Sequence, residues 1–481
     1  MNTTISRKDL IPKVQRALVL QGGGALGAYQ AGAFRCLYKK LSEIQKEKIE
    51  KDIPLFDIIA GTSIGAINGA IIVSYFVENK TWDGAPEQLE AFWKHLSTPT
   101  PNLSEVLKPW KIEHDKGEPL IASEESARRY YSVKKFLQSG VENVFKPINP
   151  PKEDNKFCDS QNQWLVYDNQ PLRKSIEKFA KFPIATSIDK GEPRLLVVSV
   201  DAAEGTTVTF DSYESEEGKR ESVYGPTHLG ESIIIQYDEG IGIKHLMASS
   251  SIPEVYAYEE LDDRKFWDGG ILSNTPVKEL VEAHQKFWEK RIGSKNLEDS
   301  FRIRTNGKEL NKNVGDIYDK NTLDNQYQIQ RVPDLEIYIV NLLDPKQNTH
   351  DPSTKNIIPQ DFDGVKDRHT DIRLGKVYNL ETYGLYADYV NLVEKLIVLG
   401  EKDEILQEKI NRILDEYTPR RYMTEQIKRN IDVIKNSFKI VKITQIQRRD
   451  DDNSISGKLA DFTSETIDRL IQEGYQDAMS K

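Results

Sequence analysis

A serine at the centre of a G-x-S-x-G motif, Ser63, has the setting of a nucleophile. Residues 56–60 read as a buried strand before it, and residues 66–76 as a small apolar helix after it. Such a turn exposes a hydroxyl at the carboxyl end of the strand, and Gly61 and Gly65 let the backbone turn tightly. The bare motif arises by chance in long chains. Its position between a strand and a helix is what makes Ser63 a candidate nucleophile.

A glycine run directly follows the first predicted strand, residues 14–21. Its members are Gly22, Gly23, Gly24, Ala25, Leu26 and Gly27. Unencumbered backbone amides at the start of a predicted helix, residues 28–41, suit an anion, so we expect this loop to hold an oxyanion. The run also fits the dinucleotide fingerprint G-x-G-x-x-G. That alternative needs an acidic residue at the end of the next strand, which instead ends in Ala60. A purely structural glycine turn is the third interpretation.

A serine nucleophile needs a base, and none of the seven histidines has a setting that marks it as catalytic. His245 is the most tempting, but we expect a core or capping role for it. Asp268 is the stronger candidate, because two aromatic residues precede it and Gly269 and Gly270 follow it. A free aspartate, with a pKa of about 3.9, is a poor base for an alcohol, but burial raises that pKa. An ordinary Asp-Gly turn is the alternative.

Two successive strand–turn–helix units predict a parallel sheet covered by helices. Further strands are expected at residues 195–200, 206–210, 233–235, 335–343 and 438–447. Residues 78–163, rich in Pro, Trp and charge, predict an insertion, either a lid over the site or a surface excursion. Helical periodicity at residues 377–399 and 464–479 predicts core-facing helices in a mostly helical C-terminal region, residues 346–481.

The composition fits a soluble folded protein, with 38% hydrophobic and 30% charged residues. Lys+Arg of 66 against Asp+Glu of 76 gives a net charge of −10, which argues against non-specific nucleic-acid binding. Cys36 and Cys158 have neither metal-ligand nor disulfide spacing, so we expect reduced thiols and no metal. We recognise neither a secretory signal nor a run of about 18 apolar residues. A cytoplasmic location with at most peripheral lipid contact is expected.

The glycine run, the Ser63 motif and the Asp268-Gly-Gly turn, in this order, resemble the patatin-like phospholipases. Residues 245–253 and 267–276 are similar to bacterial members, and residues 167–172 and 474–478 to a subgroup with an added C-terminal domain. The resemblance implies a patatin-like three-layer α/β/α domain with a mainly parallel central sheet over residues 1–345. A mostly helical domain would then occupy residues 346–481.

The resemblance also implies a Ser63–Asp268 dyad that works without histidine, metal or cofactor. The glycine run would hold the oxyanion, and Gly269 and Gly270 would support Asp268. Leu26 stands where many relatives have Lys or Arg, so basic help to the oxyanion is absent. The expected substrate is a fatty-acyl ester such as a phospholipid. An intracellular polyester, a neutral ester, or a non-catalytic lipid- or partner-binding module are the alternatives.

Overall fold

The structure is a computed structural model in which two compact units are distinguished. It describes residues 11–47, 54–99, 124–148, 166–214, 218–224, 234–293, 332–344, 358, 362–375, 405–406, 408–409, 412, 438–449 and 454–481. The smaller unit comprises Met1–Arg16, Val277–Ile337 and Asn379–Ile443. The larger unit comprises Ala17–Pro276, Tyr338–Tyr378 and Thr444–Lys481, and it holds all three sequence motifs.

The described part of the smaller unit centres on helix α8, Val277–Ile292. Trp288 and His284 are buried on this helix. The Trp288 indole donates a hydrogen bond to the Gln15 side chain at 2.8 Å, and a ring nitrogen of His284 lies 2.8 Å from the Pro333 carbonyl oxygen. Both large polar rings are therefore accommodated by hydrogen bonding as well as by packing.

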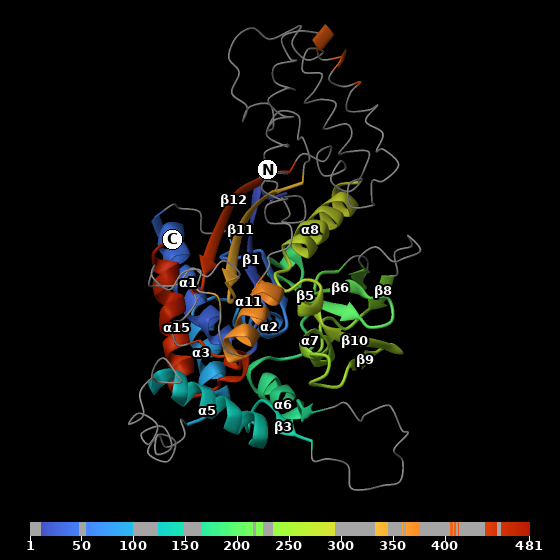
Figure 1. Ribbon diagram of the computed structural model, residues 1–481. Coiled ribbons are helices and arrows are strands. Elements are labelled where there is room, and N and C mark those ends of the chain that lie inside the picture. Colours follow the sequence, from blue (N-terminus) through green and yellow to red (C-terminus); the bar gives the residue numbers. More distant parts are fainter. Residues whose placement is uncertain are drawn as a thin grey trace, which may run out of the picture. The chain divides into compact units, whose positions relative to one another are not determined.

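A mixed sheet organises the fold, and most of its strand residues belong to the larger unit (Figure 1). Its order in the described residues is β12-β11-β1-β2-β5-β6-β7-β8, with β10 pairing with both β5 and β9. The strands are β1 Val14–Leu20, β2 Ile58–Thr62, β5 Arg194–Asp201, β6 Thr206–Asp211, β7 Arg220–Tyr224, β8 Ile234–Tyr237, β9 Glu259–Leu261, β10 Arg264–Asp268, β11 Asp334–Asn341 and β12 Ile440–Gln447. A separate pair joins β3, Lys146–Pro147, to β4, Tyr167–Asp168.

The centre of the sheet is parallel and one side is antiparallel. β1 pairs in parallel with β2, and β2 with β5. The pairs from β5 to β8 are antiparallel, as is β10 with β5. On the side of β1 away from β2, the backbone amide of Gln21 donates to the Val340 carbonyl oxygen at 3.3 Å, where β1 and β11 both end. Parallel strands that end at one edge bring their following loops together, which is what a site built from several loops requires.

Helices flank the sheet, and the predicted α/β fold is confirmed. They are α1 Ala28–Glu47, α2 Ile64–Asn79, α3 Ala85–Leu96, α5 Glu124–Ser139, α6 Gln170–Phe179, α7 Ile243–Ser250, α11 Phe362–Gly375 and α15 Ser464–Met479. Short 3-10 helices are η2 Gly24–Gly27, η4 Ile188–Lys190, η5 Gly269–Ile271 and η7 Lys458–Ala460. The helix expected at residues 377–399 lies outside the described residues. Within the described residues, every helix is too short or too polar to span a membrane.

Parts of the predicted insertion, residues 78–163, belong to the core. Phe92 and Trp93 of α3 are fully buried, and the Trp93 indole donates to the Asn68 side chain of α2 at 3.1 Å. Residues 100–123 and 149–165 lie outside the described residues, so a lid over the site stays a prediction. So does the domain boundary at residue 345, although the larger unit also includes Thr444–Lys481.

The crossing of α1 and α15 is close because glycines lie at the contact, and Figure 1 shows the two helices side by side. A Cβ at Gly32 would lie 1.7 Å from the carbonyl oxygen of Ile471, and one at Gly474 would lie 2.0 Å from that of Tyr29. The Tyr29 hydroxyl also donates to Asp477 at 2.8 Å. Helix α15 thus completes the core beneath the helix that follows the glycine run.

The α1–α15 contact predicts the sign of one substitution. In an isolated helix, Gly474→Ala would gain about 1 kcal/mol from helix propensity. Here the added methyl group meets the Tyr29 carbonyl oxygen, and overpacking costs about 1–3 kcal/mol. Because the neighbour is backbone, which cannot move aside cheaply, the upper end of that cost applies, and we expect the free energy of unfolding in urea to fall by about 2 kcal/mol. Gln472→Ala, on the exposed face of the same helix, should leave it unchanged. A gain in stability with Gly474→Ala would contradict the close crossing.

Candidate active site

Two of the three strands that pair with β5, namely β2 and β10, bring Ser63 and Asp268 together across 205 positions of sequence. β2 runs parallel to β5 and ends with Thr62 opposite Val198. β10 runs antiparallel to β5 and ends with Asp268 opposite Ser199. β6 occupies the other edge of β5 over these residues, so β2 and β10 share one edge and meet end to end. The residue that follows β2 and the last residue of β10 are therefore neighbours.

Ser63 lies on the sharp turn that the sequence predicted. Its backbone has φ 55° and ψ −126°, a conformation that a non-glycine residue adopts at a cost. The flanking glycines make the turn possible: a Cβ at Gly61 would lie 2.4 Å from the Gly65 carbonyl group, and one at Gly65 would lie 2.2 Å from the Leu20 carbonyl oxygen. The Ser63 amide donates to the Ser249 hydroxyl oxygen at 2.9 Å.

Asp268 is a buried carboxylate that accepts two hydrogen bonds. One comes from the Ser63 hydroxyl and the other from the Gly270 amide, at 2.7 Å. Burial raises the pKa of Asp268 to about 6, against the lowering effect of both bonds. Gly269 is required beside it, because a Cβ there would lie 2.4 Å from the Val198 carbonyl oxygen. At neutral pH this carboxylate is ionised, yet it is more basic than an exposed one, so it can take a proton from Ser63.

The glycine run lies against Ser63, and its backbone amides differ in whether they have a hydrogen-bond acceptor. A Cβ at Gly22 would lie 3.1 Å from the Ser63 Cβ, but the Gly22 amide already donates to the Asn274 carbonyl oxygen at 3.1 Å. Among the described residues, the amides of Gly23 and Gly24 have no acceptor. The remaining members, Ala25, Leu26 and Gly27, are buried in η2. We therefore expect Gly23 and Gly24 to supply the donors of an anion site next to Ser63.

A chain of buried amide side chains holds this loop from behind. Gln21 donates to the Thr275 hydroxyl at 2.7 Å and accepts from the Leu342 amide at 2.7 Å. Gln30 donates to the Gln21 carbonyl oxygen at 2.7 Å and accepts from Asn68 at 2.8 Å. Satisfied networks of this kind fix a single backbone conformation, because a buried amide without a partner is costly.

Two residues at the site had no predicted role. Asn274 donates from its side chain to the Gly22 carbonyl oxygen at 3.0 Å, so it bonds both backbone groups of Gly22. Ser249 accepts from the Ser63 amide and donates to the Val198 carbonyl oxygen. Both lie in the segments that resemble bacterial patatins, but only their partners, far away in sequence, reveal what they do.

His245, His95 and the His284 described above lie in structural settings. His245 accepts a hydrogen bond from the Gly242 amide at 2.9 Å, and burial lowers the pKa of its ring to about 4. The capping role expected for it is confirmed. His95 lies 3.2 Å from the Ser175 hydroxyl oxygen. Three further histidines, His114, His228 and His350, lie outside the described residues.

Among the described residues, the side chains that could ligate a metal ion do not gather into a metal site. Cys36 is a buried free thiol whose pKa is raised by burial, and Cys158 lies outside the described residues. Within the described ranges, no group of three or more His, Cys, Asp or Glu is placed to hold a metal ion.

Comparison with known proteins gives one family match. The family model of the patatin-like phospholipases matches residues 18–281, which include Ser63, Asp268 and the glycine run. Among solved structures, the crystal structure of VipD from Legionella pneumophila aligns with a TM-score of 0.29 and 12% sequence identity. The alignment covers 98% of this chain and 66% of that one, just under two thirds of its length. The search of curated proteins gave no match.

The burial of Asp268 predicts a pH-dependent gain in stability for Asp268→Asn. The folded carboxyl group, with a pKa of about 6, keeps its proton between about pH 4 and 6, where the unfolded one has lost it. The stability that this group contributes is therefore lost as pH rises through that window. Asparagine stays neutral and has the same shape. We expect Asp268→Asn to raise the free energy of unfolding by about 3 kcal/mol at pH 7.5 and to change it little at pH 4.

Urea unfolding at both pH values measures this difference. Asp211→Asn is the matched control. The buried Asp211 carboxylate pairs with Arg194, so this variant should be less stable than wild type at pH 7.5. An Asp268→Asn protein less stable than wild type at pH 7.5 would contradict the raised pKa.

Proposed function

The chain belongs to the patatin-like phospholipase family, and from that premise we propose that it hydrolyses fatty-acyl esters with Ser63 as nucleophile and Asp268 as general base. The observation that carries the proposal is the hydrogen bond from the Ser63 hydroxyl to a buried carboxylate whose pKa is raised to about 6. A serine on a strand-to-helix turn, bonded directly to a base, is the arrangement of an activated nucleophile.

The reaction follows from the positions of these groups. The Ser63 oxygen attacks the acyl carbonyl carbon while its proton passes to Asp268, and the carbonyl oxygen becomes an oxyanion. The amides of Gly23 and Gly24 and the start of α2 stabilise that charge. The tetrahedral intermediate collapses, the alcohol leaves with the proton from Asp268, and an acyl-enzyme remains. Water then attacks the acyl-enzyme carbonyl carbon while its proton passes to Asp268. Asp268 returns that proton to the Ser63 oxygen as the fatty acid leaves, which restores both residues.

Exposed apolar side chains near Asp268 support a lipid as substrate. Ile271 and Leu272 follow the Asp268-Gly-Gly turn, and Ile252 follows the Ser251 carbonyl group that accepts the Asp268 amide. Their exposed fractions are 43%, 42% and 38%. Apolar surface beside a polar reacting pair suits an acyl chain and contact with a lipid surface. We therefore extend the proposal to phospholipid presented in a bilayer.

The dyad predicts the activity of two folded variants. Ser63→Ala removes the nucleophile and Asp268→Asn removes the base, so we expect kcat/KM for phospholipid to fall about 1,000-fold or more in each. Wild-type kcat/KM should rise with pH through about 6, as Asp268 ionises. Mass spectrometry of the released lipids, with triglyceride and polyhydroxybutyrate as competing substrates, identifies the product.

Each substrate result separates the alternatives. If the protein turns over only the polyester or only the triglyceride, that compound replaces phospholipid as the proposed substrate. A wild-type protein that neither turns over any ester nor reacts with a fluorophosphonate at Ser63 would instead be a binding module.

The apolar side chains predict a difference between dispersed and bilayer substrates. Leu272→Asp places a charge where lipid would lie, so we expect activity on phosphatidylcholine vesicles to fall about 10-fold or more. Hydrolysis of a short soluble ester should stay within about twofold. Ile44→Asp is the matched control: Ile44 is equally exposed but lies about 24 Å along α1 from the glycine run. Equal loss of both activities in Leu272→Asp would contradict the lipid contact.

A further inference from the structure

A short segment beyond residue 281 lies directly against the glycine run. Gly24 has φ +53°, and a Cβ there would lie 2.4 Å from the Leu459 carbonyl oxygen. Leu459 is the middle residue of η7, Lys458–Ala460. The backbone of η7 therefore packs against the backbone of η2, at one of the two amides to which the oxyanion site is assigned. A shift of η7 would open space beside Gly24.

One end of η7 is held by a buried ion cluster. Lys458 is 1% exposed, and its ammonium nitrogen lies 2.6 Å from a carboxylate oxygen of Asp371 and 3.0 Å from one of Asp367. Both carboxylates belong to α11, one turn apart. On the same helix, Asp363 accepts hydrogen bonds from the amide and hydroxyl of Ser456. Three acidic side chains of α11 thus hold residues 456–458.

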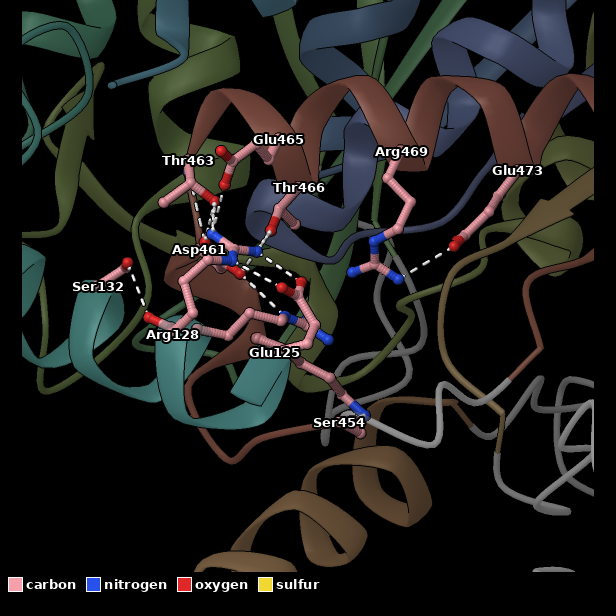
Figure 2. A network of polar contacts seen from close by, with 12 residues as sticks. Glu125, Arg128, Ser132, Ser454, Asp461, Thr463, Glu465, Thr466, Arg469 and Glu473 are labelled. Carbon is pink, nitrogen blue, oxygen red and sulfur yellow. Dashed lines mark hydrogen bonds and ion pairs between the residues drawn. The ribbon is translucent and has the colours of Figure 1, made fainter. Parts of the chain in front are cut away.

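The other end of η7 is held by Asp461, which is fully buried (Figure 2). Its carboxylate accepts from Arg129 of α5 at 3.0 Å, from the Thr463 hydroxyl at 2.8 Å and from the Thr466 hydroxyl at 2.8 Å. Arg128 in turn donates to both threonine hydroxyls. The segment after η7 is therefore tied to α5 and to the first turn of α15.

Helix α11 also reaches the loop by a second route. The side-chain nitrogen of Asn274 donates to the Leu374 carbonyl oxygen, in the last turn of α11, at 2.8 Å and to the Gly22 carbonyl oxygen at 3.0 Å. One amide group thus joins α11 to the first residue of the glycine run. The loop is contacted at Gly22 through Asn274 and at Gly24 through Leu459.

We propose that η7 and α11, clamped by Lys458 and Asp461, form a brace that holds Gly22–Gly24 in the conformation that binds the oxyanion. Lys458 and Asp461 are positioning residues: neither touches the substrate. Buried charges tie the brace to fixed partners, because a buried ion left without its partner is strongly unfavourable. A displacement of about 1 Å in a group that stabilises a transition state is enough to cost a large factor in rate. The catalytic consequence rests on the proposed function, whereas the effect on the loop does not.

The test compares Lys458→Met with Arg194→Met. Both substitutions break a buried ion pair of the larger unit, but Arg194 pairs with Asp211 at the opposite end of β5 from Ser199. Deuterium exchange of the peptide that contains residues 22–27 is measured in both variants, below their unfolding temperatures. We expect faster exchange in Lys458→Met only. For a short soluble ester, kcat per folded molecule should fall about 10- to 100-fold in Lys458→Met, with KM within about twofold.

A conservative variant keeps the test decisive if Lys458→Met does not fold. Asp371→Asn preserves shape and leaves the Lys458–Asp367 pair, so the same two changes should occur to a smaller extent. Unchanged exchange of residues 22–27 in a folded brace variant would overturn the proposal, as would equal changes in Arg194→Met. If residues 22–27 exchange faster in a brace variant but the wild-type protein hydrolyses no ester, the brace is retained and the proposed function is overturned.

Discussion

The site depends on a change of partner along one edge of β5. Up to Val198 the neighbour of β5 on that edge is β2, and from Ser199 it is β10. Hydrogen bonding of the ladder fixes both registers, and a slip of one residue would turn every side chain to the other face. The carboxyl ends of two strands that run in opposite directions therefore meet at one point. Ser63 and Asp268 are adjacent because their strands pair with consecutive residues of β5, Val198 and Ser199.

Two locally unfavourable features are maintained at that point. Ser63 has a positive φ, and Asp268 keeps a carboxylate in a site where burial opposes its charge. Neither would persist in a loosely held loop. The parallel strands, the close glycine contacts and the buried amide chain from Gln21 to Asn68 supply the rigidity that maintains them. The proposed reactivity and the stability oppose each other here, since the charge that Asp268 would need as a base also weakens the fold.

Local sequence patterns predicted much of the fold and those parts of the site that are contiguous in sequence. The strand before Ser63, the glycine run and the span of α15 follow from periodicity and turn residues within short windows. The pairing of Ser63 with Asp268 came from the family resemblance, because no local rule connects residues 205 positions apart. Asn274 and Lys458 could not be assigned from sequence. An asparagine after a turn and a lysine in a polar segment are ordinary until their partners, Gly22 and Asp371, are known.

The glycine contact between α1 and α15 has a consequence for synthesis. A ribosome completes α1 roughly four hundred residues before it makes α15. Until then, the α1 surface around Gly32 that α15 covers has no partner, and domains that close on late segments are exposed to misassembly during translation. The nascent chain therefore carries the Ser63 turn long before the core around it can close. Folding of this unit therefore waits until α15 has been translated.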